Sequence, residues 1–191
     1  MAHPIQHVVV LMLENRSFDH LLGALDQRIA GLEGVQAALR YLADPAHGNP
    51  AQPGGSAVPL TGDAASSLDR KSLGESADFD PSHDFVDVKR QLGGSLSAPV
   101  MNGFVADAYD KYQSVFNPAT LDSSISQVMR HFPADTTSTG AIPALHTLAT
   151  QFTICDRWFS SVPGPTWPNR IFALAGTTRG NLRMPEGLAG M

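Results

Sequence analysis

The sequence contains a single cysteine, Cys155, among its 191 residues. One cysteine excludes an internal disulfide and also excludes a zinc site built from several thiolates. Cys155 falls in a run rich in β-branched and aromatic residues, Phe152 to Phe159, which is typical of a strand. We therefore expect Cys155 to fill a buried position of that strand.

Charged residues and long apolar runs are scarce. Only 16% of the residues are charged, against roughly 25% in typical domains, and 13 Lys and Arg face 18 Asp and Glu, for a net charge of −5. With no basic cluster, nucleic-acid binding is not expected. The longest apolar run, Val8 to Leu13, is far shorter than the ~20 residues of a membrane helix, and no signal-peptide pattern follows Met1. We expect no transmembrane segment and a cytoplasmic location.

Three common catalytic motifs are absent. The sequence has no G-x-S-x-G, no G-x-G-x-x-G and no P-loop pattern, which argues against serine hydrolases, dinucleotide-binding proteins and P-loop enzymes. Its seven histidines include no pair with the spacing of a helical zinc site. His146 falls between the apolar positions of its predicted helix, so we expect it to be exposed.

The order of apolar patterns predicts an α/β fold with a mostly parallel sheet flanked by helices. Residues 7–13 form a continuous apolar run of strand length, and residues 152–159 form a second strand. Helical stripes follow Ser17, span residues 101–112 and begin again at Pro143. The composition shifts to Pro, Gly, Ser and Ala at about 44–80, which predicts an irregular insertion within one domain, residues 1–191.

Glu14 and Asn15 follow the first predicted strand directly, and Ser17 is a suitable cap for the helix after them. Ligands bind at the carboxyl ends of the strands in open α/β sheets, so this pair is a candidate for a binding site. The alternative is a solvent-exposed acid beside a turn asparagine. The residues alone leave both open.

Thr166 stands between the second strand and a helix pattern that Gly176 closes. Pro163, Gly164 and Pro165 force a tight loop before it, which makes Thr166 a predicted N-cap residue. A hydroxyl there faces unpaired N–H groups and the positive end of the helix dipole, an environment suited to phosphate. Thr166 is therefore either a plain capping residue or a nucleophile that a divalent cation could activate.

His83 follows the predicted insertion, in a helix that Ser82 could cap and in which Phe85, Val88 and Leu92 form the apolar stripe. In the first turn of that helix, a neutral imidazole is favoured over an imidazolium.

Four stretches together resemble a known family. They are residues 8–20 (VVVLMLENRSFDH), 83–85 (HDF), 152–159 (FTICDRWF) and 162–170 (VPGPTWPNR). The chain resembles the bacterial phospholipase C and acid phosphatase type phosphoesterases, a branch of the alkaline phosphatase superfamily. The likeness covers nearly the whole chain apart from the insertion.

The resemblance implies a role for each matching residue. Glu14 looks like the carboxylate ligand of an active-site metal, and Asn15 like the neighbour that contacts both metal and substrate phosphate. Thr166 looks like the nucleophile and a further metal ligand. His83 looks like the histidine that faces the phosphate, as a charge stabiliser or proton donor.

The resemblance also implies an alkaline-phosphatase-like core and a metal-dependent hydrolase of phosphate esters, including phospholipids, that acts through a threonine nucleophile. One or more divalent ions of undetermined identity would be required. Many relatives are exported. The family carries a second half with further acids and histidines, which this sequence lacks, so the expected domain is incomplete at its C-terminus. The alternative function is a non-catalytic remnant that lacks part of the metal site. Oligomeric state is left undetermined.

Overall fold

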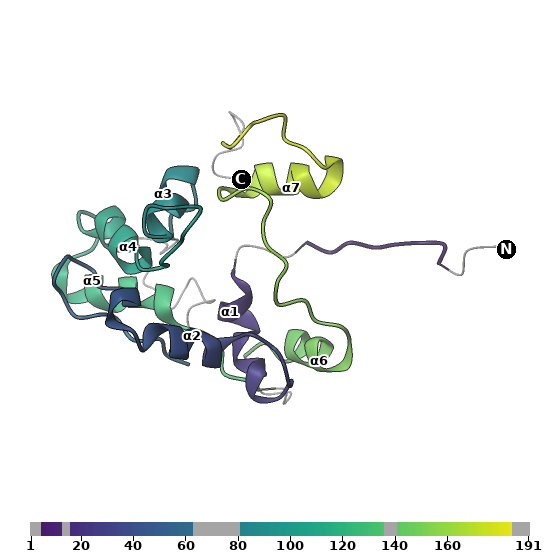
Figure 1. The fold of residues 1–191 in the computed structure, drawn as a ribbon, viewed down its shortest axis with the longest axis horizontal. Helices are drawn as coiled ribbons and strands as arrows, with labels where there is room; N and C mark the ends of the chain where they lie inside the picture. The colour runs from purple at the N-terminus through teal and green to yellow at the C-terminus, as the bar shows by residue number, and fades with distance from the viewer. Residues whose placement is uncertain (1–4, 13–15, 63–80, 136–140, 185–191) are drawn as a thin grey trace.

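The computed structural model describes residues 5–12, 16–62, 81–135 and 141–184. Its elements, with η for a 3₁₀ helix, are α1 (Phe18–Leu21), η1 (Gly23–Gln27), α2 (Val35–Leu42), η2 (Pro45–His47), α3 (Phe85–Gln91), α4 (Phe104–Tyr112), α5 (Pro118–Ile125), η5 (Ser126–Met129), α6 (Pro143–Gln151) and α7 (Thr166–Ala175). Helices α2 to α5 lie together, with α6 and α7 on the other side of α1 (Figure 1). None of the helices described is long and apolar enough to cross a membrane.

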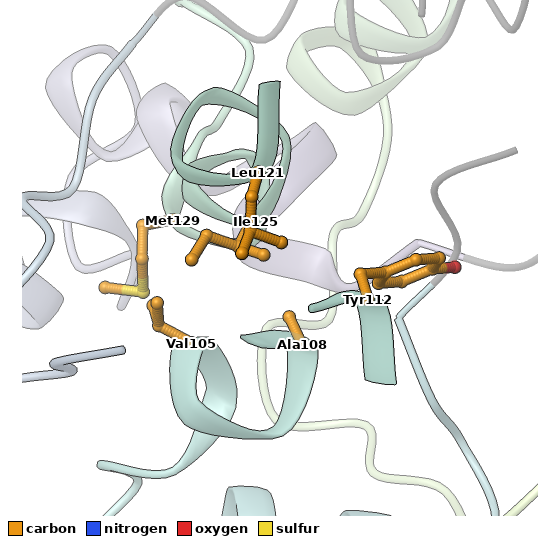
Figure 2. Packing of buried hydrophobic residues seen from close by; sticks show 6 residues of the cluster. All are labelled: Val105, Ala108, Tyr112, Leu121, Ile125 and Met129. Atoms are coloured by element: carbon orange, nitrogen blue, oxygen red, sulfur yellow. The ribbon is translucent and has the colours of Figure 1, made fainter. Parts of the chain in front are cut away.

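The apolar core lies where α4 packs against α5 and η5. Its buried side chains are Val105, Ala108, Tyr112, Leu121, Ile125 and Met129 (Figure 2). The α4 members follow helical spacing, which confirms the predicted inward stripe. Met101, predicted to begin that stripe, lies before the helix because its φ of 61° is not helical.

A buried asparagine attaches the irregular segment after α2 to the start of α4. Asn49 is 2% exposed; its Nδ2 donates to the Met101 carbonyl oxygen (2.9 Å), and its Oδ1 accepts from the Phe104 N–H (2.9 Å). Because the N-cap residue of α4 is a glycine without a capping side chain, Asn49 satisfies an N–H that the helix leaves unpaired. Of the insertion predicted at 44–80, residues 44–62 are described, and the rest lies outside the described residues.

Buried polar side chains join α3 to α4. The Gln91 Nε2 donates to Asp107 Oδ2 (2.9 Å) and to the Ser82 carbonyl oxygen (2.6 Å). Asp107 is 3% exposed, and this burial raises the pKa of its carboxyl, an effect that the hydrogen bond from Gln91 partly offsets. The glycine at position 103 permits the close approach of the two helices, because a β-carbon there would lie only 2.1 Å from the Arg90 carbonyl oxygen.

The described residues do not confirm the predicted parallel sheet. Residues 5–12 run outward as an extended segment, and Val9 in it is 91% exposed (Figure 1). Residues 152–159 are irregular, with Trp158 85% exposed. A strand needs a neighbour that pairs its N–H and C=O groups and covers its side chains, and neither segment forms a β ladder within the described ranges.

Polar contacts with the turn before α2 hold residues 152–159 instead. The Asp156 Oδ2 accepts from the Glu33 N–H (2.7 Å), and Arg157 forms an ion pair with the Glu33 carboxylate. Cys155 is exposed, so the predicted buried position is wrong. The prediction assumed a buried strand, which residues 152–159 do not form in the part of the chain that the structure describes.

The prediction that His146 is exposed is also wrong. Helix α6 begins at Pro143 as predicted, but His146 is 1% exposed. Its Nδ1 and Nε2 each lie 2.8 Å from a backbone carbonyl oxygen, of Asp135 and Leu21 respectively. The imidazole thus joins α6 to α1 by polar contacts, which the spacing of apolar residues cannot indicate.

Replacing Asp107 with asparagine tests the cost of burying this carboxylate. Its pKa in the folded protein is raised above the unfolded value of 3.8, so its contribution to stability is complete below that value and is lost as pH rises through the folded pKa. An asparagine keeps an oxygen for Gln91 without the charge. We expect Asp107→Asn to remove this pH-dependent component and to be at least as stable as the wild type at about pH 7.

Urea unfolding of both proteins from about pH 3 to pH 8 would measure the effect. A variant that kept the wild-type pH dependence, or that lost more than ~2 kcal/mol at every pH, would show that the buried charge does not govern the stability of this contact.

Candidate active site

Thr166 is the first residue of α7. Pro165 occupies the N-cap position with φ −72° and ψ 175°, so the predicted capping role of Thr166 is wrong by one residue: its own backbone is already helical. Pro168 lies in the first turn, where a missing N–H costs nothing. The helix ends as predicted at Gly176, whose φ of 70° is left-handed.

This position gives the Thr166 side chain an electropositive setting. The first N–H groups of α7 have no acceptor within the helix, and the helix dipole places partial positive charge at this end. Thr166 is half-buried, and no side chain forms a cap hydrogen bond at the start of α7. Both features suit a phosphate group held close to the hydroxyl.

His83 lies just before α3. It is exposed, and its Nδ1 lies 3.1 Å from the Pro81 carbonyl oxygen. Because a carbonyl only accepts, Nδ1 carries the hydrogen, and a neutral ring has its lone pair on Nε2. The expected place in the first turn is wrong, because Asp84 is the N-cap residue and Gln91 binds the Ser82 carbonyl from the far end of α3.

The loop before Thr166 contacts the start of α3, which follows His83. A β-carbon at Gly164 would lie 3.8 Å from the Phe85 nitrogen and 3.5 Å from the Leu182 carbonyl oxygen. Helices α3 and α7 are neighbours in Figure 1. The structure therefore brings together the chain segments that carry His83 and Thr166.

Glu14 and Asn15 lie outside the described residues, so their predicted contacts with a metal stay a prediction. The helix that follows them, α1, lines a groove together with α6 and residues 153–155, which lead toward Thr166. Across the ranges that the structure describes, no three His, Cys, Asp or Glu side chains form a group that could hold a metal.

Helix α1 carries a histidine whose electrostatics are unusual. Ser17 caps the helix as predicted, its Oγ accepting from the His20 N–H (3.2 Å). Burial, together with nearby Arg16, lowers the pKa of His20 to about 4. The ring also packs edge-on against Phe132, with centroids 5.5 Å apart. His20 is therefore neutral near pH 7 and suits packing rather than phosphate binding.

Sequence reasoning missed two side chains that support the candidate site. Gln91 and Asn169 each bind backbone carbonyls of the segments that carry His83 and Thr166. The position of Asn169 in the stretch that carries the resemblance was the only signal for it. Gln91 gave no signal, because its partners are set by how α3 packs on α4.

Comparison with known proteins identifies the family of the chain. Residues 5–190 match the sequence profile of the Phosphoesterase family. Non-specific phospholipase C6 of Arabidopsis thaliana is 36% identical over 93% of this chain, and non-specific phospholipase C3 of the same plant is 30% identical over 94%. Phospholipase C B of Mycobacterium tuberculosis is 28% identical over 88%.

The chain spans only 29% to 31% of the length of these three relatives. The matched range nonetheless runs from the first extended segment to beyond α7, and the positions of His83 and Thr166 fall within it. The chain belongs to the phosphoesterase family.

Proposed function

We propose that this chain carries the nucleophile of a metal-dependent phosphoesterase, and that Thr166 is that nucleophile. The observation that carries the proposal is the position of Thr166. It is the first residue of α7, beside a loop that packs against the start of α3 just after His83. A substrate phosphate at this helix end would meet unpaired N–H groups next to a hydroxyl.

The reaction follows from that placement. The Thr166 Oγ1 attacks phosphorus in line, forming a phosphorus–oxygen bond while the bond to the leaving alkoxide breaks. The hydroxyl proton passes to solvent, and the leaving oxygen takes up a proton. Water then attacks the phospho-threonine, which releases phosphate or a phosphomonoester and restores the hydroxyl.

His83 is suited to the protonation steps. With hydrogen on Nδ1, directed at the Pro81 carbonyl, the Nε2 atom can accept a proton and return it to a leaving oxygen. When both nitrogens carry hydrogen, the ring also offsets negative charge on the phosphoryl oxygens. The contact of Gly164 with the start of α3 supports this role, because it places the segment after His83 against the loop that precedes Thr166.

The proposed metal ligands are Glu14, Asn15 and Thr166. A carboxylate, an amide oxygen and a hydroxyl are hard donors that suit a divalent cation. When bound, such a cation supplies positive charge that favours the ionised Thr166 hydroxyl and the developing charge on phosphate.

Phosphate esters of lipids are the proposed substrate class. Three relatives of this chain are named phospholipases C. A phospholipase C cleaves between glycerol and phosphate, which requires only that the leaving oxygen belong to diacylglycerol.

We also propose that residues 5–12 and 152–159 form strands in the complete phosphoesterase unit. Both segments are extended or irregular with exposed apolar side chains, as expected of strands without a neighbour. Pairing them in one sheet would bring Glu14 and Asn15 to the same edge as the Thr166 loop.

One observation favours the alternative, a chain that binds no catalytic metal by itself. Glu14, Asn15 and Thr166 carry a single carboxylate between them, whereas hard divalent ions take about six oxygens, several from carboxylates. We expect purified residues 1–191 to retain much less than about one equivalent of metal after dialysis. Stoichiometric retention, measured by elemental analysis and lost in Glu14→Ala, would contradict this expectation.

Substitution of Thr166 tests the nucleophile in the full-length polypeptide that carries these residues. Thr166→Ala should lower kcat for an aryl phosphate by at least about 10⁴-fold, because no oxygen remains to attack. Thr166→Ser should keep measurable turnover, since it loses only the methyl group that restricts the rotamer. An alanine variant with near-parental kcat would mean that another group attacks phosphorus.

Substitution of His83 separates phosphate chemistry from metal binding. We expect His83→Ala to lower kcat by about 10²- to 10⁴-fold while the metal content of the same preparation is unchanged. His47→Ala is a matched control, because His47 is a second histidine that ends the short helix η2 and stacks on Tyr41 instead. Loss of metal in His83→Ala would reassign His83 as a metal ligand.

A further inference from the structure

Asn169 lies one turn into α7, three residues after Thr166, and its carboxamide points back to the preceding loop. Its Oδ1 accepts from the Val162 N–H (2.9 Å), and its Nδ2 donates to the Val162 carbonyl oxygen (2.9 Å). The same Nδ2 lies 3.1 Å from the Pro165 carbonyl oxygen and 3.3 Å from that of Gly164. One side chain thus binds three residues of the loop.

The pattern of donors and acceptors requires a carboxamide. Val162 presents an N–H and a C=O to Asn169, as it would to a peptide group on a neighbouring strand. A carboxamide has one accepting oxygen and two N–H hydrogens, which matches this pair and leaves a donor for Gly164 and Pro165 to share. A carboxylate would place an oxygen against three carbonyl oxygens.

This loop is partly buried, with Val162 and Pro165 at its two ends shielded from solvent, so its shape depends on these hydrogen bonds. Val162 is 2% exposed, and Pro165 and Pro168 are among the fully buried residues. Proline offers no N–H, and Pro165, as N-cap residue, makes no side-chain cap hydrogen bond. The bonds from Asn169 therefore supply the polar partners that the loop cannot find in a sheet or a cap.

We propose that Asn169 is a positioning residue for Thr166. The proposal rests on Thr166 being the nucleophile, as argued above. Asn169 touches neither a substrate position nor the Thr166 hydroxyl in any bond the structure gives. It binds the carbonyl oxygen of Pro165, the residue directly before α7. This bond fixes where α7 begins and therefore the direction in which the Thr166 side chain points. A displacement of about 1 Å at a nucleophile can cost about 100-fold in rate.

The first test is amide hydrogen exchange in Asn169→Ala and Asn169→Asp, followed by NMR. Asn169→Ala removes the acceptor of the Val162 N–H, so exchange at Val162 should be at least about tenfold faster. Asn169→Asp keeps an acceptor there but loses the donor, so its effect should fall mainly on the Gly164 N–H, which bonds within the same loop (2.8 Å to the Val162 oxygen). Unchanged exchange at both amides in both variants would overturn the proposal. This test does not require the protein to be catalytically active.

The second test is the rate in the full-length polypeptide. Each Asn169 variant should lower kcat for an aryl phosphate by about 10- to 100-fold, with KM within about threefold of the parent, because Thr166 is displaced while phosphate contacts remain. Asn117→Ala is the matched control: Asn117 caps α5 by accepting from the Thr120 N–H (3.1 Å), far along the chain from Thr166. It should lower thermal stability and leave kcat unchanged.

The outcomes separate the two proposals. If Thr166→Ala remains active, the nucleophile assignment fails whatever the Asn169 variants do. If Thr166→Ala is inactive while both Asn169 variants are folded and keep the parental kcat, Asn169 is only a brace and the positioning proposal fails. Global unfolding of both Asn169 variants, seen as loss of dispersion in the same NMR spectra, would equally reduce its role to stability.

Discussion

The packing of α4 against α5 and η5 is the contact to which α3 and the segment after α2 are attached. It buries apolar side chains from three helices, and two other parts of the chain attach to α4 by buried amides. Asn49 fastens the segment after α2 to the first turn of α4, and Gln91 fastens α3 through Asp107. Without this core, α3 would have no fixed helix to pack against, and the segment that carries His83 just before α3 would not be held in place.

The candidate site itself is held by side chain to backbone hydrogen bonds. Gln91 binds the carbonyl before His83, and Asn169 binds the loop before Thr166. In both cases one amide satisfies backbone groups that are part of no helix. Such bonds fix where a segment lies without using the Thr166 hydroxyl, which suits the role that we propose for it.

Local patterns predicted α1, α3, α4, α6 and α7 but not α2 or α5, and they failed where the outcome depends on distant partners. The sequence predicted the apolar stripe of α4, the cap at Ser17 and the glycine that ends α7, because capping and helical periodicity involve residues only a few positions apart. Strands pair with distant segments, so β-type composition at residues 152–159 could not reveal whether a partner is present. The predicted exposure of His146 was wrong for the same reason, since the two carbonyl oxygens that contact its ring belong to residues outside α6.

Helix α7 has a defined phase, because it is bounded by a proline at one end and a left-handed glycine at the other. The helix therefore cannot be extended by one residue at its start or shifted by one residue at its end. Each residue turns an α-helix by about 100°. If one residue were added or removed before Thr166, the helix could not shift along its axis to compensate, and the Thr166 hydroxyl would point in a different direction. The length of the Val162–Pro165 loop is therefore as constrained as its composition.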